Sequence, residues 1–199
     1  MNKTLLSSSI VLGASLAMAL GACSSKTDTS ADKPADVTSA TVTPAAAGPC
    51  PTAAAAADAA PQWTLPGATG SVAVTGSTDA AAPKVDVTKP FSVTETQVQT
   101  LTAGSGPIVA PTATVSVCYM GVNGRDGSVF DSSYERGEAV DFPLNGVVPG
   151  FQKAIAGQKV GSTVAVAMTS ADGYPNGQPR AGIEPGDSLI FAIKILGAS

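Results

Sequence analysis

The stretch Pro149-Gly150-Phe151-Gln152-Lys153-Ala154-Ile155-Ala156 is the one segment of the globular part that suits a helix. Its Phe151 and Ile155 are four positions apart and so stack on one helix face, and Gly157 can end the helix in a left-handed conformation. Two turns are all that this segment can make. Because so short a helix buries a sheet only if the sheet curls around it, we expect a cavity between helix and sheet, lined by inward-pointing aromatic side chains.

Short strands are predicted on both sides of this helix, because apolar and polar residues alternate between Gly-rich and Pro-rich turns. The last strand places Leu189, Phe191, Ile193 and Ile195 on one face, which we expect to cover the core of a sheet with one buried side. The predicted fold class is α+β, with a curled, mainly antiparallel β-sheet of about five strands wrapped around one short α-helix. The predicted strands are 91–101, 112–120, 140–144, 162–169 and 187–196.

A β-rich extension is predicted before this domain, over residues 63–87. Residues 71–76 and 83–87 alternate at period two and end at Gly or Pro, which indicates two strands. We expect these strands to extend one edge of the sheet.

Composition excludes several classes of function. The chain has 199 residues, a size that permits one modest domain plus non-globular segments. Its 11 Lys and Arg against 15 Asp and Glu give a net charge of −4, and the basic residues are scattered, so nucleic acid is not an expected partner. The chain contains no histidine, which excludes a Ser-His-Asp triad, a His-based metal site and an imidazole general base.

The amino-terminal segment predicts export. A single Lys3 precedes an uncharged apolar run, residues 5–20, which is typical of a secretory signal. The run ends in Leu20-Gly21-Ala22-Cys23, which resembles the bacterial lipobox, where the signal is cut just before a cysteine that receives acyl chains. The alternative is an ordinary cleavage site beside a chance cysteine. The lipobox interpretation makes residues 1–22 a lipoprotein signal peptide and Cys23 a lipid anchor in the cell membrane, facing the extracytoplasmic side.

Residues 23–62 are predicted to be a lipid-anchored, disordered linker. After Cys23 this segment is built from Ala, Thr, Ser, Pro and Asp, and its branched aliphatic residues before Pro61 are only Val37 and Val42. Such a segment buries too little apolar surface to offset the entropy of ordering.

Two cysteines remain when Cys23 is acylated. Outside the cytosol Cys50 and Cys118 can pair as a disulfide, and the alternative is two free thiols. Alternation along residues 112–120 puts Cys118 on the polar face of its strand, where the passing linker could reach it.

Five motifs, in this order and spacing, resemble the FKBP-type peptidyl-prolyl cis-trans isomerases. The resemblance covers residues 88–199 and leaves residues 1–62 outside. It implies the fold already predicted and an isomerase activity on X-Pro bonds. The motifs are Val117-Cys118-Tyr119-Met120-Gly121, then Asp126-Gly127-Ser128-Val129-Phe130-Asp131-Ser132-Ser133, then Val147-Val148-Pro149-Gly150-Phe151, then Asp172-Gly173-Tyr174, and Ile183 with Leu189-Ile190-Phe191.

The same resemblance implies the site residues. The Tyr174 hydroxyl and the Val148 backbone N–H would donate to ligand carbonyls, and Phe151 would lie beneath the proline ring. The Asp131 carboxylate would orient groups within the site, close to Arg136. The implied catalytic residues are Tyr119, Phe130, Asp131, Tyr174 and Phe191, and the implied substrate-binding residues are Val140, Val147, Val148, Phe151, Ile183 and Arg136.

Each of these residues also has a plainer interpretation. An inward-pointing aromatic residue most often serves core packing alone, and Asp131 can be a solvated turn aspartate that starts local hydrogen bonds. The sequence also departs from the family. Phe151 stands where the best-studied members have tryptophan, Pro175 replaces the usual glycine after Tyr174, and Arg180 lies in a loop that is more apolar in the family.

Isomerisation of an X-Pro bond explains how a site can work without histidine. The barrier of about 18–20 kcal/mol comes from lost amide resonance, and no covalent bond breaks, so binding the twisted amide better than the planar one is enough. No cofactor and no metal are expected. We expect a monomer that assists the folding of exported proteins at the cell envelope, with X-Pro segments as partners and rapamycin-like macrolides as inhibitors. The alternative is a catalytically weak FKBP-like binding module for proline-containing partner segments.

Overall fold

The computed structural model describes residues 50–199, so the predicted signal peptide, Cys23 and the first part of the predicted linker lie outside the described residues. Its main sheet has six antiparallel strands in the order β4, β8, β9, β5 and β6, with β7 also paired to β5. The mainly antiparallel α+β fold is thereby confirmed. The strands are β4 (Gln97–Thr102), β5 (Thr114–Asn123), β6 (Val129–Ser132), β7 (Val140–Pro143), β8 (Thr163–Met168) and β9 (Leu189–Ala198).

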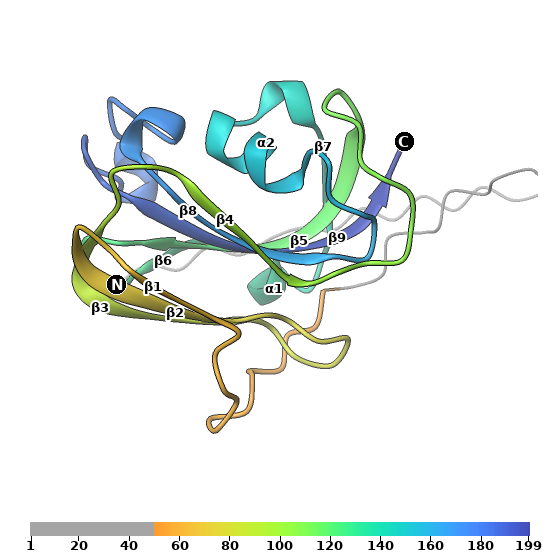
Figure 1. Cartoon of the computed structure of the whole chain (residues 1–199), viewed down its shortest axis with the longest axis horizontal. Helices are drawn as coiled ribbons and strands as arrows, with labels where there is room; N and C mark the ends of the chain where they lie inside the picture. Colours follow the sequence, from red (N-terminus) through yellow and green to blue (C-terminus); the bar gives the residue numbers. More distant parts are fainter. Residues whose placement is uncertain (1–49) are drawn as a thin grey trace, which may run out of the picture. The chain divides into compact units, whose positions relative to one another are not determined.

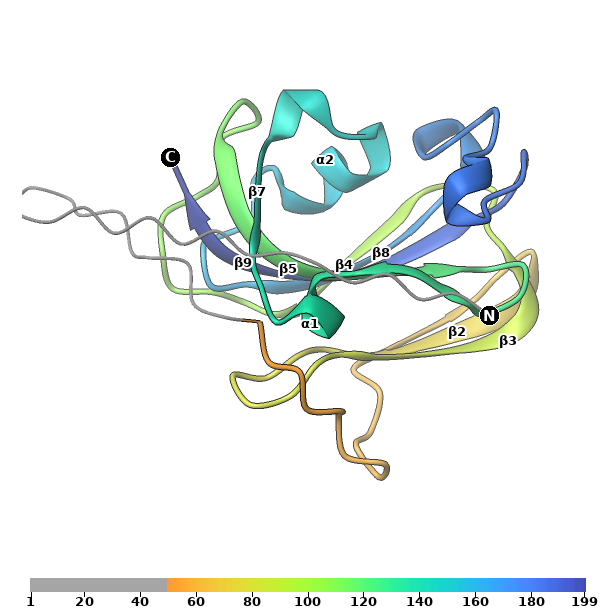
Figure 2. The same ribbon diagram turned by 180° about the vertical axis from the view of Figure 1, so that it is seen from behind.

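The predicted helix is α2 (Pro149–Ile155), which lies over one face of the main sheet (Figures 1 and 2). Pro149 occupies the first helical position, where its missing N–H costs nothing, and Gly157 follows the helix with a φ of +82°. Gly150 lets the helix approach β8 closely, because a Cβ there would lie 2.8 Å from the Met168 side chain. Phe151 and Ile155 are both buried, as the four-residue spacing predicted.

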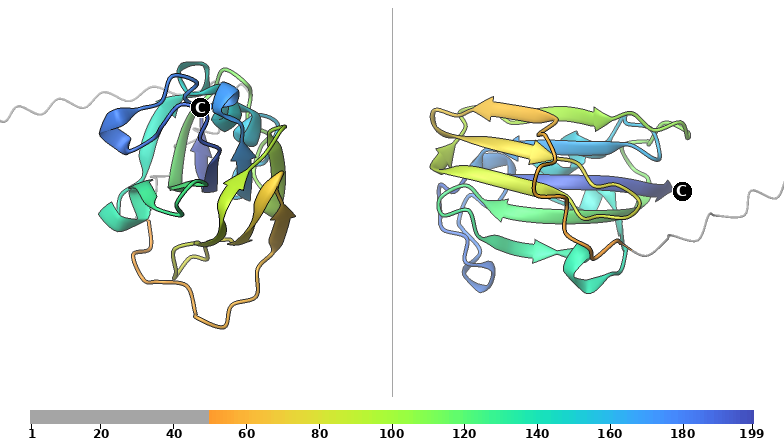
Figure 3. Two further views of the ribbon diagram at one scale, coloured as in Figure 1. Left: turned by 90° about the vertical axis from the view of Figure 1, so that its left-hand side faces the viewer. Right: turned by 90° about the horizontal axis from the view of Figure 1, so that it is seen from below.

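A second sheet covers the other face of the main sheet (Figure 1; Figure 3, right). It consists of β1 (Trp63–Pro66), β2 (Thr69–Thr75) and β3 (Lys84–Ser92), in that order. Val72, Val74 and Phe91 pack with Ile190 and Ala192 of β9. The predicted edge extension is therefore a separate three-stranded layer, and the predicted sheet with one buried side is wrong, because β9 is buried on both faces.

Two other predictions of secondary structure need correction. The predicted strand over residues 91–101 is divided between β3 of the outer sheet and β4 of the main sheet, because the chain crosses between the layers at residues 93–96. A four-residue helix, α1 (Ser133–Arg136), was not predicted. The Ser132 side chain accepts from the Glu135 N–H at its start, and Gly137 ends it with a φ of +71°.

The remaining helical segments are single turns. They are three 3-10 helices, η1 (Leu144–Gly146), η2 (Ser170–Asp172) and η3 (Pro179–Ala181). Over residues 50–199, the structure contains no helix long and apolar enough to cross a membrane.

A disulfide joins Cys50 to Cys118 of β5. Cys118 lies on the face of β5 predicted for it, but it is buried rather than exposed, because Tyr134 and Ala82 pack around the disulfide. The Cys50 N–H donates to the Gly137 carbonyl (3.2 Å), and further along the Ala53 carbonyl accepts from the Ala82 N–H (2.8 Å). Residues 50–62 therefore have defined contacts with the domain, in contrast to the disordered linker predicted up to residue 62.

Candidate aromatic site

Five aromatic rings meet between α2 and the main sheet, and we call them the aromatic cluster. Each comes from a different element: Tyr119 from β5, Phe130 from β6, Phe142 from β7, Phe151 from α2 and Phe191 from β9. The centroid of Phe151 lies 5.1 Å from that of Phe191, 5.3 Å from that of Phe142 and 5.8 Å from that of Tyr119. Phe130 contacts Phe191 at 5.5 Å. Most of these pairs are close to perpendicular, the arrangement in which a ring edge meets a ring face.

The cluster lies where the sequence predicts a cavity between helix and sheet. Phe151 and Phe191 are only 5% and 4% exposed, and Phe151 contacts three neighbouring rings. Tyr119, Phe130 and Phe142 are half-buried. Phe151 and Phe191 therefore form the buried part of the cluster, and its accessible part consists of the three half-buried rings.

Gly121 permits the contact between two of these rings. A Cβ at this position would lie 2.6 Å from Phe130 Cζ and 2.8 Å from Phe191 Cε1, closer than real side-chain contacts allow. The residue lies within the motif that contains Tyr119, and it extends the site beyond the predicted residues. Phe142 is the second addition. The alternation of residues 140–143, which puts Val140 and Phe142 on one face, is the signal that could have indicated it.

The Tyr119 hydroxyl is held by a charged pair at the edge of the cluster. It donates a hydrogen bond to Asp131 Oδ2, and Arg136 Nη1 of α1 donates to Asp131 Oδ1. The Arg136 guanidinium also lies 6.0 Å from the centre of the Tyr119 ring. Asp131, Arg136 and Tyr119 are thus brought together as predicted, and the plainer interpretation of Asp131 as a free turn aspartate is not what the structure shows.

The pKa values of this group show which protonation states it has. Burial raises the pKa of the Tyr119 phenol to about 12, and its hydrogen bond to Asp131 adds to the increase. Burial also acts to raise the pKa of Asp131, but the hydrogen bonds from Tyr119 and Arg136 outweigh it, so this pKa lies below its ordinary value. At neutral pH the site therefore holds a neutral phenol and an ionised carboxylate paired with a guanidinium.

Two hydrogen-bond donors at the rim of the cluster are free. Within residues 50–199, no protein group accepts a hydrogen bond from the Tyr174 hydroxyl or from the Val148 N–H. Both residues are half-buried and pack against the main core, as does Val147. A ligand carbonyl above the ring edges could accept from either donor.

The other two predicted rim residues have different surroundings. Ile183 is 2% exposed and lies in the main core with Phe151 and Phe191. Val140 is half-buried on β7, where it pairs with Val117, and the structure does not pack it into this core. Phe142, two residues along the same strand, packs against this core, and the substrate-binding role of Val140 stays a prediction.

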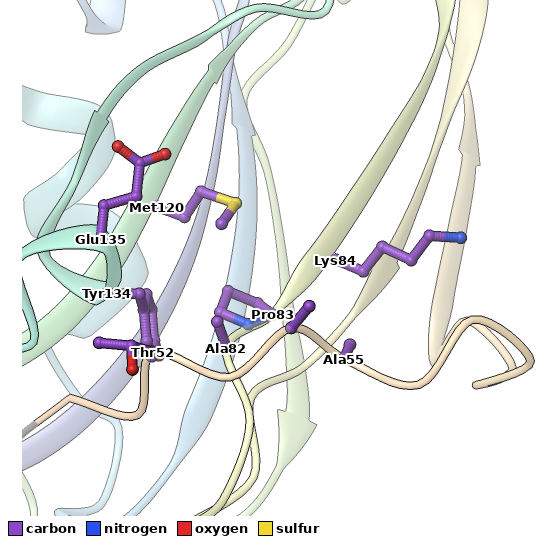
Figure 4. Close-up of a pocket in the computed structure, with 9 residues that line it drawn as sticks. Thr52, Ala55, Ala82, Pro83, Lys84, Met120, Tyr134 and Glu135 are labelled. Carbon is purple, nitrogen blue, oxygen red and sulfur yellow. The ribbon is translucent and has the colours of Figure 1, made fainter.

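A cavity of about 310 Å³ lies elsewhere, against α1 (Figure 4), and two of its lining residues, Ala82 and Tyr134, also pack around the disulfide. Met120 lines it because alternation along β5 sends this side chain to the face opposite Tyr119. Its walls are mostly Ala, Pro, Met and Tyr side chains, and the lysine at its edge, Lys84, is already paired with Asp86 (2.8 Å).

Comparisons with known proteins agree on one family. The model of a family described as "FKBP-type peptidyl-prolyl cis-trans isomerase" matches residues 106–196. The chain is 38% identical over 100 residues to the FKBP-type 22 kDa peptidyl-prolyl cis-trans isomerase of Escherichia coli K12, a match that spans 50% of this chain and 48% of that protein. It is 36% identical over 98 residues to a probable FK506-binding protein of Corynebacterium glutamicum, covering 48% of this chain and 80% of that protein.

A solved structure supports the fold alone. The N-terminal domain of FKBP42 from Arabidopsis thaliana aligns with a TM-score of 0.50 at 15% identity, over 53% of this chain and 87% of that chain. The match with the 22 kDa Escherichia coli relative is partial, because the chain spans about half of that protein's length. The family model begins at residue 106, after the outer sheet, which ends at Ser92.

Proposed function

The chain belongs to the family of FKBP-type peptidyl-prolyl cis-trans isomerases, and we propose that it accelerates the cis–trans isomerisation of X-Pro bonds at the aromatic cluster. The observation that carries this proposal is the combination of half-exposed ring edges with two free donors, the Tyr174 hydroxyl and the Val148 N–H. An apolar surface with few and well-placed donors can hold a proline ring and orient the carbonyl groups beside it.

The chemistry needs only a preference for the twisted amide. The planar amide is the more charge-separated form, so an apolar surface from which water is excluded favours the twisted form. In this proposal Phe151 and Phe191 form the base of the surface, and Tyr119 and Phe130 form its sides. Isomerisation moves no proton on net, so the Asp131 carboxylate holds the Tyr119 hydroxyl and Arg136 and does not serve as an acid or base.

The proposed place of action is the cell envelope. The sequence Leu20-Gly21-Ala22-Cys23 supports lipid attachment at Cys23, and the disulfide between Cys50 and Cys118 fits a compartment outside the cytosol. There the protein would act, as a monomer, on X-Pro segments of exported polypeptides. Metabolic labelling with an alkyne fatty acid in a bacterial host tests the anchor: the chain should be labelled and Cys23→Ala should not, and equal labelling of both would contradict it.

The enzymatic proposal is tested by measuring rate and affinity together. The purified full-length chain is mixed with a peptide containing one X-Pro bond, and the isomerisation rate is followed by NMR exchange and the affinity by titration. We expect acceleration well above the uncatalysed rate, and its loss when a rapamycin-like macrolide is added. A folded chain that neither binds nor accelerates would refute the proposal.

One observation favours a second candidate function. Because Phe151 stands where well-studied family members have tryptophan and is only 5% exposed, the surface could bind proline segments without twisting them efficiently. The chain would then be a binding module. In the experiment above, saturable binding with an unchanged isomerisation rate would identify this function.

A further inference from the structure

The loop between η2 and β9 carries two rim residues, Tyr174 and Ile183, and is fastened at its far end by a buried polar cluster. We call Asn123, Arg125 and Asp187 the neck cluster. Asn123 is fully buried at the end of β5, and the Asp187 side chain is only 6% exposed just before β9. These residues lie outside the aromatic cluster and have no part in the chemistry proposed above.

The carboxylate of Asp187 is fully engaged by donors from two sides. Asn123 Nδ2 donates to Oδ2 at 2.7 Å, Arg125 Nε donates to Oδ1 at 3.1 Å, and the backbone N–H of Glu184 donates to Oδ2 at 2.8 Å. A buried carboxylate needs such partners, because an unpaired one is costly to remove from water. The first two donors belong to β5 and the turn after it, and the third belongs to the loop, so Asp187 joins the loop to the sheet.

The same cluster holds the backbone on both sides of Ile183. Arg125 Nη2 donates to the carbonyl of Gly182 at 3.0 Å, while Glu184 is held by Asp187. Ile183 itself exchanges two backbone hydrogen bonds with Gln178, at 2.8 and 3.1 Å, which close the turn around η3. The backbone is therefore held on both sides of Ile183, whose side chain lies in the main core together with Phe191 and Phe151.

Ser170 connects the held end of the loop to its start. Ser170 Oγ accepts from the Gly186 N–H at 3.1 Å and donates to the Tyr174 carbonyl at 3.3 Å. Gly186 is the direct neighbour of Asp187. The two ends of the loop are therefore tied together beside the neck cluster, and both Tyr174 and Ile183 lie within the loop that this contact closes.

From this arrangement we propose that Asp187, held by Asn123 and Arg125, is a positioning residue for the isomerase site. It fixes the loop so that Ile183 completes the apolar surface and the Tyr174 hydroxyl points to where a substrate carbonyl would lie. This inference rests on the proposed function. As a consequence, loosening the neck cluster should weaken substrate binding more than it lowers the isomerisation rate of the bound substrate.

The test is Asp187→Asn in the full-length chain, with steady-state kinetics on an X-Pro peptide. The Asn side chain has nearly the same volume as Asp, but it carries no charge, and its own N–H group would face the N–H donors that now bind the carboxylate. We expect KM to rise about tenfold while kcat changes less than twofold. In hydrogen exchange, the Ile183 amide should exchange about tenfold faster, and the amide of Ile193 in the centre of β9 should be unchanged.

The matched controls are Asp126→Asn and Glu184→Gln, which remove exposed carboxylates facing the same arginine at 3.4 and 3.7 Å. Both should leave KM unchanged. If Asp187→Asn does not fold, Arg125→Gln replaces it, since the Arg125 side chain is 38% exposed and its loss leaves the buried Asn123 contact in place. Arg125→Gln should raise KM in the same direction, and Arg125→Lys should restore part of the affinity.

The outcomes separate this inference from the proposed function. Wild-type kinetics in a folded Asp187→Asn chain would overturn the inference and leave the proposed function intact. If Asp187→Asn and Arg125→Gln both lower kcat as much as they raise KM, and both also lower the global stability, the inference would be overturned as well, because that pattern is a general structural effect. A wild-type chain without activity would contradict the proposed function itself, whereas the exchange experiment would still report on the loop.

Discussion

The two tyrosines of the site differ in one respect that can be measured. The Tyr119 hydroxyl has a protein partner, Asp131, whereas the Tyr174 hydroxyl has none within residues 50–199. Tyr174→Phe should therefore remove a hydrogen bond that forms only with ligand. A neutral hydrogen bond contributes about 0.5–1.5 kcal/mol net, which corresponds to roughly a 2- to 13-fold weaker affinity. The free energy of unfolding should stay within about 0.5 kcal/mol of wild type, because no internal bond is lost.

The matched control is Tyr134→Phe. The Tyr134 hydroxyl donates to Ser77 at 2.8 Å, the residue is 2% exposed, and it lies in the core around the disulfide. This variant should lose about 1 kcal/mol of stability and keep wild-type affinity. Affinity is measured by titration with a rapamycin-like macrolide and with an X-Pro peptide, and stability by urea unfolding. An unchanged dissociation constant for Tyr174→Phe, or a loss of stability like that of the control, would refute the assignment of Tyr174 as a ligand donor.

Three further predictions concern the scaffold. Gly121→Ala should force Phe130 and Phe191 apart, cost about 1–3 kcal/mol of stability and lower the isomerisation rate. A wild-type rate in the folded variant would show that the ring contact is irrelevant to activity. Replacing both Cys50 and Cys118 by Ala should lower the unfolding free energy by about 4 kcal/mol, since the disulfide closes a loop of 68 residues; urea unfolding with little change would contradict this. The free energy of unfolding should fall as the pH drops below about 4. The pKa values of Asp131 and Asp172 are lowered in the folded chain, so these groups stay ionised there at a pH at which the unfolded chain already binds protons. A free energy of unfolding that rises between pH 5 and pH 3 would contradict this prediction.

The parts of the structure that were predicted correctly depend on local patterns. Phe151, Ile155 and Gly157 together specify a two-turn helix with one buried face, and α2 has those properties. The alternation that put Phe191 and Ile193 on the core face of the last strand holds in β9 for the same reason. The positions of Tyr119 and Phe130 were implied by family motifs, and the structure places both in one cluster.

The errors concern interactions between distant segments. The pattern of the last strand predicts one buried face, and it does not show that an outer sheet covers Ile190 and Ala192 on the other face. The break between β3 and β4 has the same origin, since propensity does not distinguish one long strand from two strands in different layers.

How closely the aromatic rings pack could not be predicted from the sequence either. The motifs identified the rings, but the centroid distances of 5.1–5.8 Å around Phe151 follow from how five elements meet. The neck cluster is a similar case, because Asn123 and Asp187 are 64 residues apart and neither belongs to a motif.

The most direct measurement is the isomerisation rate of an X-Pro peptide during titration of the chain with a rapamycin-like macrolide. We expect the rate to fall in step with occupancy and to reach the uncatalysed value at one macrolide per chain, because both ligands need the same ring edges. A rate that stays above the uncatalysed value when the macrolide is bound at saturation would place catalysis outside the aromatic cluster and contradict the account.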